Sequence, residues 1–262
     1  MPTVDTGDIV TYYEEAGSGE PLILICGLSA DLQVWRSQVP DLCRRFRVIC
    51  YDNRGAGRTS APDQPYSIAG MADDLAALLD HLQINSAHVL GWSMGGLIAQ
   101  HFALTRPQRV RKLILLSTTC QADGFFRLAI QNWMNIRRSD MPFEQILRFV
   151  SRWGYSPAFY DNDAVYEKLI QVLAANPYAQ EAHAFLRQAE ALLAYNTGEA
   201  ASEIRAQTLV IAGIHDNLLP PYHAEVLAKT IPGATLRMLG GAHTGFDEFP
   251  DAYNRAILDF LQ

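Results

Sequence analysis

The fold of this 262-residue chain is decided by one stretch, in which an apolar run stops at a serine between glycines. The stretch reads Ala87-His88-Val89-Leu90-Gly91-Trp92-Ser93-Met94-Gly95-Gly96-Leu97-Ile98-Ala99. Its first part favours a buried strand and its last part a helix. The pattern Gly-x-Ser-x-Gly is typical of a sharp strand-to-helix elbow, where small residues let the two backbones approach. The alternative is an ordinary glycine-rich turn. Because of the flanking patterns, we predict a nucleophilic Ser93 at the top of a parallel sheet.

Further strand-like and helical patterns flank this stretch on both sides. The predicted strands are a hairpin over residues 3–16 and apolar runs at 21–26, 46–51, 110–117, 208–213 and 234–239. We expect helices from about Leu32 to Arg45, after an N-capping Ser67, and at the end of the chain, where Asp247 and Glu248 are expected to start the last helix. Strands that alternate with helices predict an α/β fold with a mostly parallel, twisted sheet and helices on both faces.

The alternation stops between Thr119 and Ile204, where the sequence is helical in pattern and rich in aromatic side chains. We predict that residues 120–204 form a helical lid, inserted into an α/β core of residues 1–119 and 205–262. An insertion there covers the carboxyl edge of the sheet, where open α/β folds bind ligands. Most of the aromatic side chains must hold the lid together. The candidates for the pocket wall are Trp92, Trp133, Trp153 and Phe159.

A nucleophilic serine needs a base to remove its proton and an acid to orient that base. Of the seven histidines, His243 follows the last predicted strand on a glycine-containing turn, at the same edge of the sheet as Ser93. Asp216 follows the preceding strand at that edge. The chain order of serine, aspartate and histidine is the one expected for this elbow. The alternative role for Asp216 is to cap the next helix, and Asp123 is the fallback acid.

The oxyanion formed by attack on a carbonyl needs two backbone N–H donors. Met94 supplies the first, because it follows Ser93 at the N-terminus of a helix. The second should come from the loop after the first apolar strand. We predict the N–H of Leu28, because Gly27 lets the chain turn at that point.

Composition limits the partners and cofactors that we expect. Hydrophobic residues make up 49% of the chain and charged residues 19%, which predicts a substantial core. The formal charge is 21 − 28 = −7 without a basic run, so neither nucleic acid nor an anionic membrane surface is an expected partner. Without a signal peptide, and with four cysteines that lack paired spacing, the chain is expected in the cytoplasm. Neither a metal-binding spacing nor a complete dinucleotide loop occurs, so no cofactor is expected.

Four motifs together carry a resemblance to a known family. They are Gly91-Trp92-Ser93-Met94-Gly95-Gly96, Asp52-Asn53-Arg54-Gly55-Ala56-Gly57, Gly213-Ile214-His215-Asp216 and Ala242-His243. With them the chain resembles the α/β-hydrolase family over nearly its whole length. It is most similar to small lidded serine hydrolases such as 3-oxoadipate enol-lactonases and carboxylesterases. The resemblance implies Ser93 as nucleophile, Asp216 as acid and His243 as base, with Leu28 and Met94 as oxyanion donors.

Two positions depart from the pattern of this family. Cys26 stands where many members have histidine, so the support of the oxyanion loop is expected to differ. Thr59 stands where a serine is usual.

The predicted function is that of a serine hydrolase that cleaves a small or medium carboxylic ester, thioester or lactone through an acyl-enzyme. Two alternatives on the same fold stay open. One is a small-molecule receptor with slow turnover, and the other is a C–C bond hydrolase or a cofactor-free haloperoxidase. Several arginines of the predicted lid could meet a substrate carboxylate, although solvated helix faces explain most of them. These are Arg127, Arg137, Arg138, Arg152 and Arg187.

Overall fold

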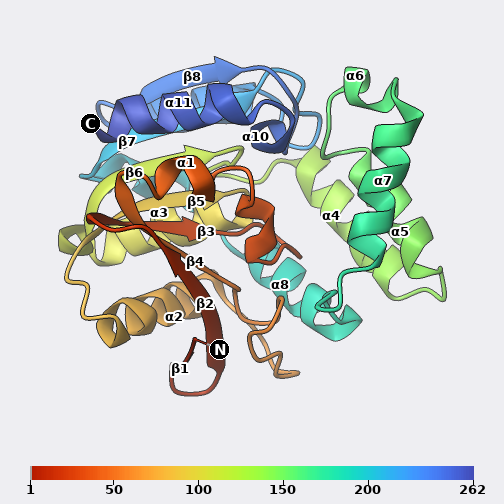
Figure 1. Cartoon of the computed structure of the whole chain (residues 1–262), viewed down its shortest axis with the longest axis horizontal. Coiled ribbons are helices and arrows are strands. Elements are labelled where there is room, and N and C mark those ends of the chain that lie inside the picture. The colour runs from red at the N-terminus through yellow and green to blue at the C-terminus, as the bar shows by residue number, and fades with distance from the viewer. Residues whose placement is uncertain (1) are drawn as a thin grey trace.

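The structure is a computed structural model that describes residues 2–262, and its strands form one eight-stranded sheet (Figure 1). The strands are β1 (Thr3–Asp5), β2 (Val10–Ala16), β3 (Glu20–Ile25), β4 (Phe46–Tyr51), β5 (Ala87–Trp92), β6 (Val110–Leu116), β7 (Gln207–Gly213) and β8 (Thr235–Leu239). Their spatial order is β1-β2-β4-β3-β5-β6-β7-β8. The pairs β1–β2 and β2–β4 are antiparallel, and all other neighbours are parallel. The predicted opening hairpin and mostly parallel sheet are therefore confirmed.

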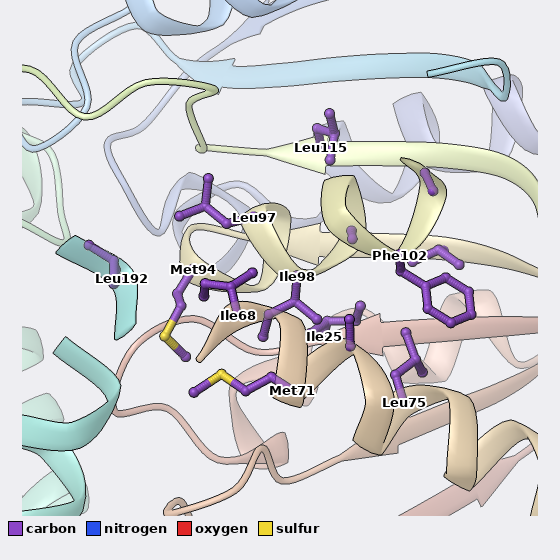
Figure 2. Packing of buried hydrophobic residues seen from close by; sticks show 14 of the residues in the cluster. Ile25, Ile68, Met71, Leu75, Met94, Leu97, Ile98, Phe102, Leu115 and Leu192 are labelled. Carbon is purple, nitrogen blue, oxygen red and sulfur yellow. The ribbon is translucent and has the colours of Figure 1, made fainter. Parts of the chain in front are cut away.

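Helices cover both faces of the sheet because successive side chains of each buried strand point to opposite faces. The helices packed on the sheet are α1 (Val39–Leu42), α2 (Ile68–His81), α3 (Met94–Thr105), α9 (Tyr222–Thr230) and α11 (Pro250–Leu261). Leu24 of β3 belongs to the core cluster on the side of α1 and α11, and its neighbour Ile25 belongs to the cluster on the side of α2, α3 and α9. Figure 2 shows Ile25 beside Ile98 of α3 and Ile68 of α2 in the second cluster.

Two predicted helices differ from the structure. The helix expected over residues 32–45 is two short pieces, the 3-10 helix η1 (Leu32–Trp35) and α1. Pro40 lacks an N–H and is therefore tolerated only in a first turn, which is where α1 places it. The last helix begins at Pro250, so the prediction that Asp247 and Glu248 start it is wrong. Both residues lie in a separate turn of helix, α10 (Gly245–Glu248).

Residues 117–206, named here the insertion, leave the sheet after β6 and return to it at β7. They contain helices and no strand, as the sequence predicted. The helices are α4 (Gly124–Arg137), α5 (Phe143–Ser151), α6 (Pro157–Tyr160), α7 (Asp163–Ala174), α8 (Ala182–Ala194) and the 3-10 helix η3 (Gly198–Glu203). In Figure 1 the green helices α4 to α7 lie beyond the carboxyl ends of the parallel strands. None of the helices within residues 2–262 has the length and apolar character needed to span a bilayer.

Candidate active site

Ser93 lies on a strained elbow between β5 and α3. Its backbone has φ 55° and ψ −119°, a combination with positive φ that residues other than glycine rarely adopt. Helix α3 closely approaches both β5 and the end of β3 at this point. A Cβ on Gly91 would lie 2.2 Å from the carbonyl oxygen of Gly95, and a Cβ on Gly95 would lie 2.3 Å from that of Ile25. Both glycines of the motif are therefore required by the geometry of the elbow.

Ser93, His243 and Asp216 form one chain of hydrogen bonds. Ser93 Oγ lies 2.9 Å from His243 Nε2, and His243 Nδ1 lies 2.8 Å from Asp216 Oδ2. An ionised carboxylate only accepts hydrogen bonds, so Nδ1 carries the proton and Nε2 offers its lone pair to the serine hydroxyl. All three side chains are buried, each from the carboxyl end of a different strand. The arrangement has the geometry of a Ser-His-Asp triad.

Neighbouring groups fix the orientation of the acid and of the base. Asp216 Oδ1 accepts hydrogen bonds from the backbone N–H groups of Leu218 (2.9 Å) and Leu219 (2.8 Å). The indole N–H of Trp92 donates to the carbonyl oxygen of His243 over 2.9 Å, and the two rings lie 5.5 Å apart. The residue before the nucleophile therefore supports the base.

The loop after β3 passes directly beside the nucleophile. A Cβ on Gly27 would lie 3.1 Å from Cβ of Ser93. Leu28, the next residue, lines the same cavity as Ser93, and Met94 is the first residue of α3. These positions suit the two N–H donors predicted from the sequence.

Two polar side chains support this loop, which follows Cys26. Asn53 Nδ2 donates to the carbonyl oxygen of Cys26 over 2.9 Å. Gln188 of α8 accepts from the N–H of Ser29 (3.1 Å) and donates to the carbonyl oxygen of Arg54 (2.8 Å). Sequence reasoning missed Gln188, because its contact with Ser29 joins positions 159 residues apart and no local sequence pattern predicts it.

A cavity of about 430 Å³ lies over Ser93 and His243, between the sheet edge and the insertion. Three of the predicted pocket residues line it, namely Trp92, Trp133 and Trp153. Phe159 does not line it, which corrects the prediction. The Phe159 ring stacks on Tyr155 with centroids 4.1 Å apart, and Tyr155 is the residue that lines the cavity.

The loop that carries His243 is tied to the insertion. The Glu248 carboxylate accepts from the N–H of Ala242 (2.8 Å) and from the Oγ of Ser156 (2.6 Å). Thr244 donates its N–H and its Oγ–H to the carbonyl oxygen of Gly154, over 2.8 and 2.6 Å. Both neighbours of His243 are thus bonded, directly or through Glu248, to residues 154–156. Sequence reasoning missed this link, because it assigned Glu248 to the start of the last helix.

The fallback acid lies elsewhere. Asp123 caps α4 by accepting from the N–H of Phe126 (2.8 Å), and its other oxygen lies 3.3 Å from His223 Nε2. Asp216 does not cap the helix that follows it, since the N-cap of α9 is Pro221. Within residues 2–262, no group of three or more His, Cys, Asp or Glu side chains could hold a metal ion.

The motif that begins at Asp52 has a structural role beside the site. The buried Asp52 carboxylate accepts from the N–H groups of Leu32 (2.7 Å) and Arg58 (2.9 Å), and burial raises its pKa to about 6. Arg54 donates two 2.7 Å hydrogen bonds to Asp74, which raise the pKa of the guanidinium. The motif therefore fixes the positions of the loops that lie next to the loop after β3.

A family model described as the alpha/beta hydrolase fold matches residues 20–250. This span contains the elbow, both triad partners of the serine and the whole insertion. The chain belongs to the α/β-hydrolase family.

Relatives of this α/β hydrolase carry several names. A provisionally named carbamate hydrolase, RutD, of Azorhizobium caulinodans is 35% identical, with 99% of this chain and 98% of the relative covered. The 3-oxoadipate enol-lactonase 2 of Acinetobacter baylyi is 32% identical over 97% of this chain and 94% of its own length. The crystal structure of an enol-lactonase from Burkholderia xenovorans superposes with a TM-score of 0.90, at 26% identity over 99% of both chains. These similarities agree with the family that the model over residues 20–250 shows.

Proposed function

We propose that this protein is a serine hydrolase that cleaves a small or medium carboxylic ester, thioester or lactone. One observation carries the proposal: the hydrogen-bonded chain from Ser93 through His243 to Asp216, at the edge of a largely apolar cavity. The elbow and the sheet-edge positions of all three residues support it. The enol-lactonases among the relatives support the substrate class.

In the first half of the reaction, His243 Nε2 takes the proton of the Ser93 hydroxyl as Oγ attacks the substrate carbonyl. Asp216 holds the Nδ1–H and stabilises the imidazolium that forms. The oxyanion is stabilised by the N–H groups of Leu28 and Met94. His243 then gives its proton to the leaving oxygen or sulfur, and the acyl group remains on Ser93.

In the second half, water replaces the leaving group. His243 removes a proton from this water, which attacks the acyl carbonyl, and the second oxyanion forms in the same place. Ser93 leaves with the proton returned by His243, and the carboxylic acid is released. No oxidant, metal or cofactor enters this scheme.

The insertion acts as a lid in this proposal. Its side chains form most of the cavity wall, and two of its segments contact the oxyanion loop and the His243 loop. The substrate class then depends on the insertion. A carbamate offers the same carbonyl to Ser93, and one relative is provisionally named for that activity, so carbamates are the second class to test.

The test is a steady-state rate series on p-nitrophenyl esters of increasing acyl length, followed by lactones and carbamates. The Ser93→Ala variant is the control. We expect turnover with an optimum at one chain length, and a loss in the variant of about 10⁶-fold if the triad acts as a unit. Residual activity of a tenth in a clean Ser93→Ala preparation would refute Ser93 as nucleophile. A burst of product followed by near silence on every substrate would instead favour the receptor alternative.

A further inference from the structure

The wall of the cavity over Ser93 contains one cation without a counterion. Arg137, the last residue of α4, lines the same cavity as Ser93 and His243. Its surroundings in the wall are apolar, and its guanidinium lies 5.5 Å from the ring centroid of Phe143 and 5.6 Å from that of Phe185. Apolar walls do not solvate a cation, so a guanidinium there requires polar or anionic partners.

No carboxylate within residues 2–262 forms an ion pair with Arg137. Its one hydrogen bond runs from Nη2 to the carbonyl oxygen of Gln180, over 2.6 Å. Its Nε is buried and has no hydrogen-bond partner among the described residues. A guanidinium carries five N–H groups, so most of its donor capacity is unused.

The other charged residues of the cavity wall have partners. Arg36 donates two hydrogen bonds to Asp247, at 3.0 and 3.1 Å. Asp31 accepts from the N–H of Gln33 (2.9 Å) and from Nδ2 of Asn176 (2.7 Å). Arg137 is thus the one cation of the described cavity wall that has no carboxylate partner.

Arg54, which is buried, shows what the half-buried Arg137 lacks. The hydrogen bonds of Arg54 to Asp74 raise its pKa, whereas burial lowers the pKa of Arg137 because nothing anionic offsets the loss of water. The two aromatic rings stabilise the cation only in part. A negative charge brought into the cavity would complete the arrangement that Arg54 already has.

We propose that Arg137 binds a carboxylate at the far end of the acyl chain of the substrate. This inference rests on the proposed function, since it concerns the same cavity. The substrates would be half-esters or lactones of dicarboxylic acids. A guanidinium fork fits a carboxylate with two parallel hydrogen bonds, and a single cation between aromatic rings suits a monoanion better than a phosphate dianion. The acyl side is favoured because the acyl chain stays in the cavity through both half-reactions, whereas the leaving group departs after the first.

Binding tests the inference independently of turnover. The probes are monomethyl esters of straight-chain dicarboxylic acids and methyl esters of monocarboxylic acids with the same number of carbons. Both series are titrated into the Ser93→Ala protein, with the fluorescence of the cavity tryptophans Trp133 and Trp153 as the readout. We expect the charged ester of the best length to bind about 10- to 100-fold more tightly than its neutral match. Adding Arg137→Met should remove this preference.

The neighbouring arginine provides the matched control. Arg138 lies on the same helix end, but its side chain is 50% exposed and faces Glu190, outside the cavity. Arg138→Met in the same background should leave the preference unchanged. Arg137→Lys keeps the charge and the stem but loses the fork, so it should weaken binding of the charged ester by several-fold and leave the neutral ester unaffected. This variant also serves if Arg137→Met does not fold, which thermal unfolding will show.

Kinetics of the active enzyme separate the possible outcomes. Arg137→Met should raise KM for the charged ester with little change in kcat. Both constants for the neutral ester should stay unchanged. An equal loss on both esters, or a wild type that prefers the neutral ester at every length, overturns the inference in favour of a structural role. If no ester is turned over but the charged probes still bind through Arg137, the proposed function fails while the carboxylate site stands.

Discussion

The two walls of the cavity are built in different ways. The wall from the sheet contains Leu28, Trp92, Ser93 and His243, and its geometry is set by backbone hydrogen bonds at the ends of parallel strands. The wall from the insertion consists of side chains from α4, α5, α7, α8 and the segments between them, which are mostly apolar and pack on one another. The difference indicates that the two walls have different roles. The backbone frame of the sheet wall holds the reacting groups to a fraction of an ångström, whereas the side-chain packing of the insertion wall adapts to a substrate.

The largest expected effect lies in the sheet wall, where the structure offers two aspartate–histidine pairs for comparison. Asp216→Asn keeps the shape of the loop but offers no carboxylate to His243 Nδ1, so the imidazole is no longer held in the tautomer that accepts the Ser93 proton. We expect kcat to fall by about 10⁴-fold with little change in KM. Asp123→Asn, next to His223, is the control and should leave kcat within about threefold, because its histidine does not touch the serine. A kcat loss below tenfold in Asp216→Asn would contradict the assignment.

The sheet wall is also the part that the sequence predicts best. Each triad residue follows an apolar run, and parallel strands end at one edge, so local patterns suffice to bring Ser93, Asp216 and His243 together. The same reasoning fails for Phe159, because which side of a one-turn helix faces the cavity depends on packing between distant helices. The link through Glu248 escapes it as well, since the carboxylate binds a residue 92 positions away.

The next effect concerns stability rather than catalysis. It comes from Asp52, whose loop lies beside the sheet wall. Burial raises the pKa of Asp52 from 3.8 to about 6, so the folded protein binds this proton more tightly than the unfolded chain does. The stability that the group contributes is fully present below pH 3.8 and is lost as the pH rises through about 6. The total loss is about 3 kcal/mol.

Urea unfolding of the wild type and of Asp52→Asn at a series of pH values measures this contribution. The difference in the free energy of unfolding, wild type minus variant, should decrease by up to about 3 kcal/mol between pH about 4 and about 7. A difference that is flat or that increases with pH would show that the two N–H donors to Asp52 already stabilise its charge. In that case the Asp52 carboxylate does not make the folded state less stable as the pH rises.

A smaller effect is expected where the two walls meet. Glu248→Gln keeps the size of the side chain but turns an N–H₂ group toward the donors of Ala242 or Ser156. The His243 loop should then shift, and we expect kcat to fall by about 10- to 100-fold together with a lower Tm. Glu225→Gln, on the exposed face of α9, is the matched control and should change neither. If Glu248→Gln lowers Tm alone, the link stabilises the fold without positioning the base.

The smallest effect tests the insertion wall. A substitution in this wall should change which substrate is preferred without changing the rate of the chemical step. Ile146 of α5 is buried against the cavity, and Ile146→Val removes one methylene from its wall. An acyl chain that contacts it loses about 0.8 kcal/mol, so KM for the preferred chain length should rise by about fourfold. Esters too short to reach α5 should keep their KM, and kcat should not change for any length. Ile214→Val, at a side chain that is 50% exposed after β7, makes the same chemical change outside the cavity and should leave every KM unaltered. A change in kcat that is equal at all lengths would mean that the insertion also positions the reacting groups, and the division between the two walls would then be wrong.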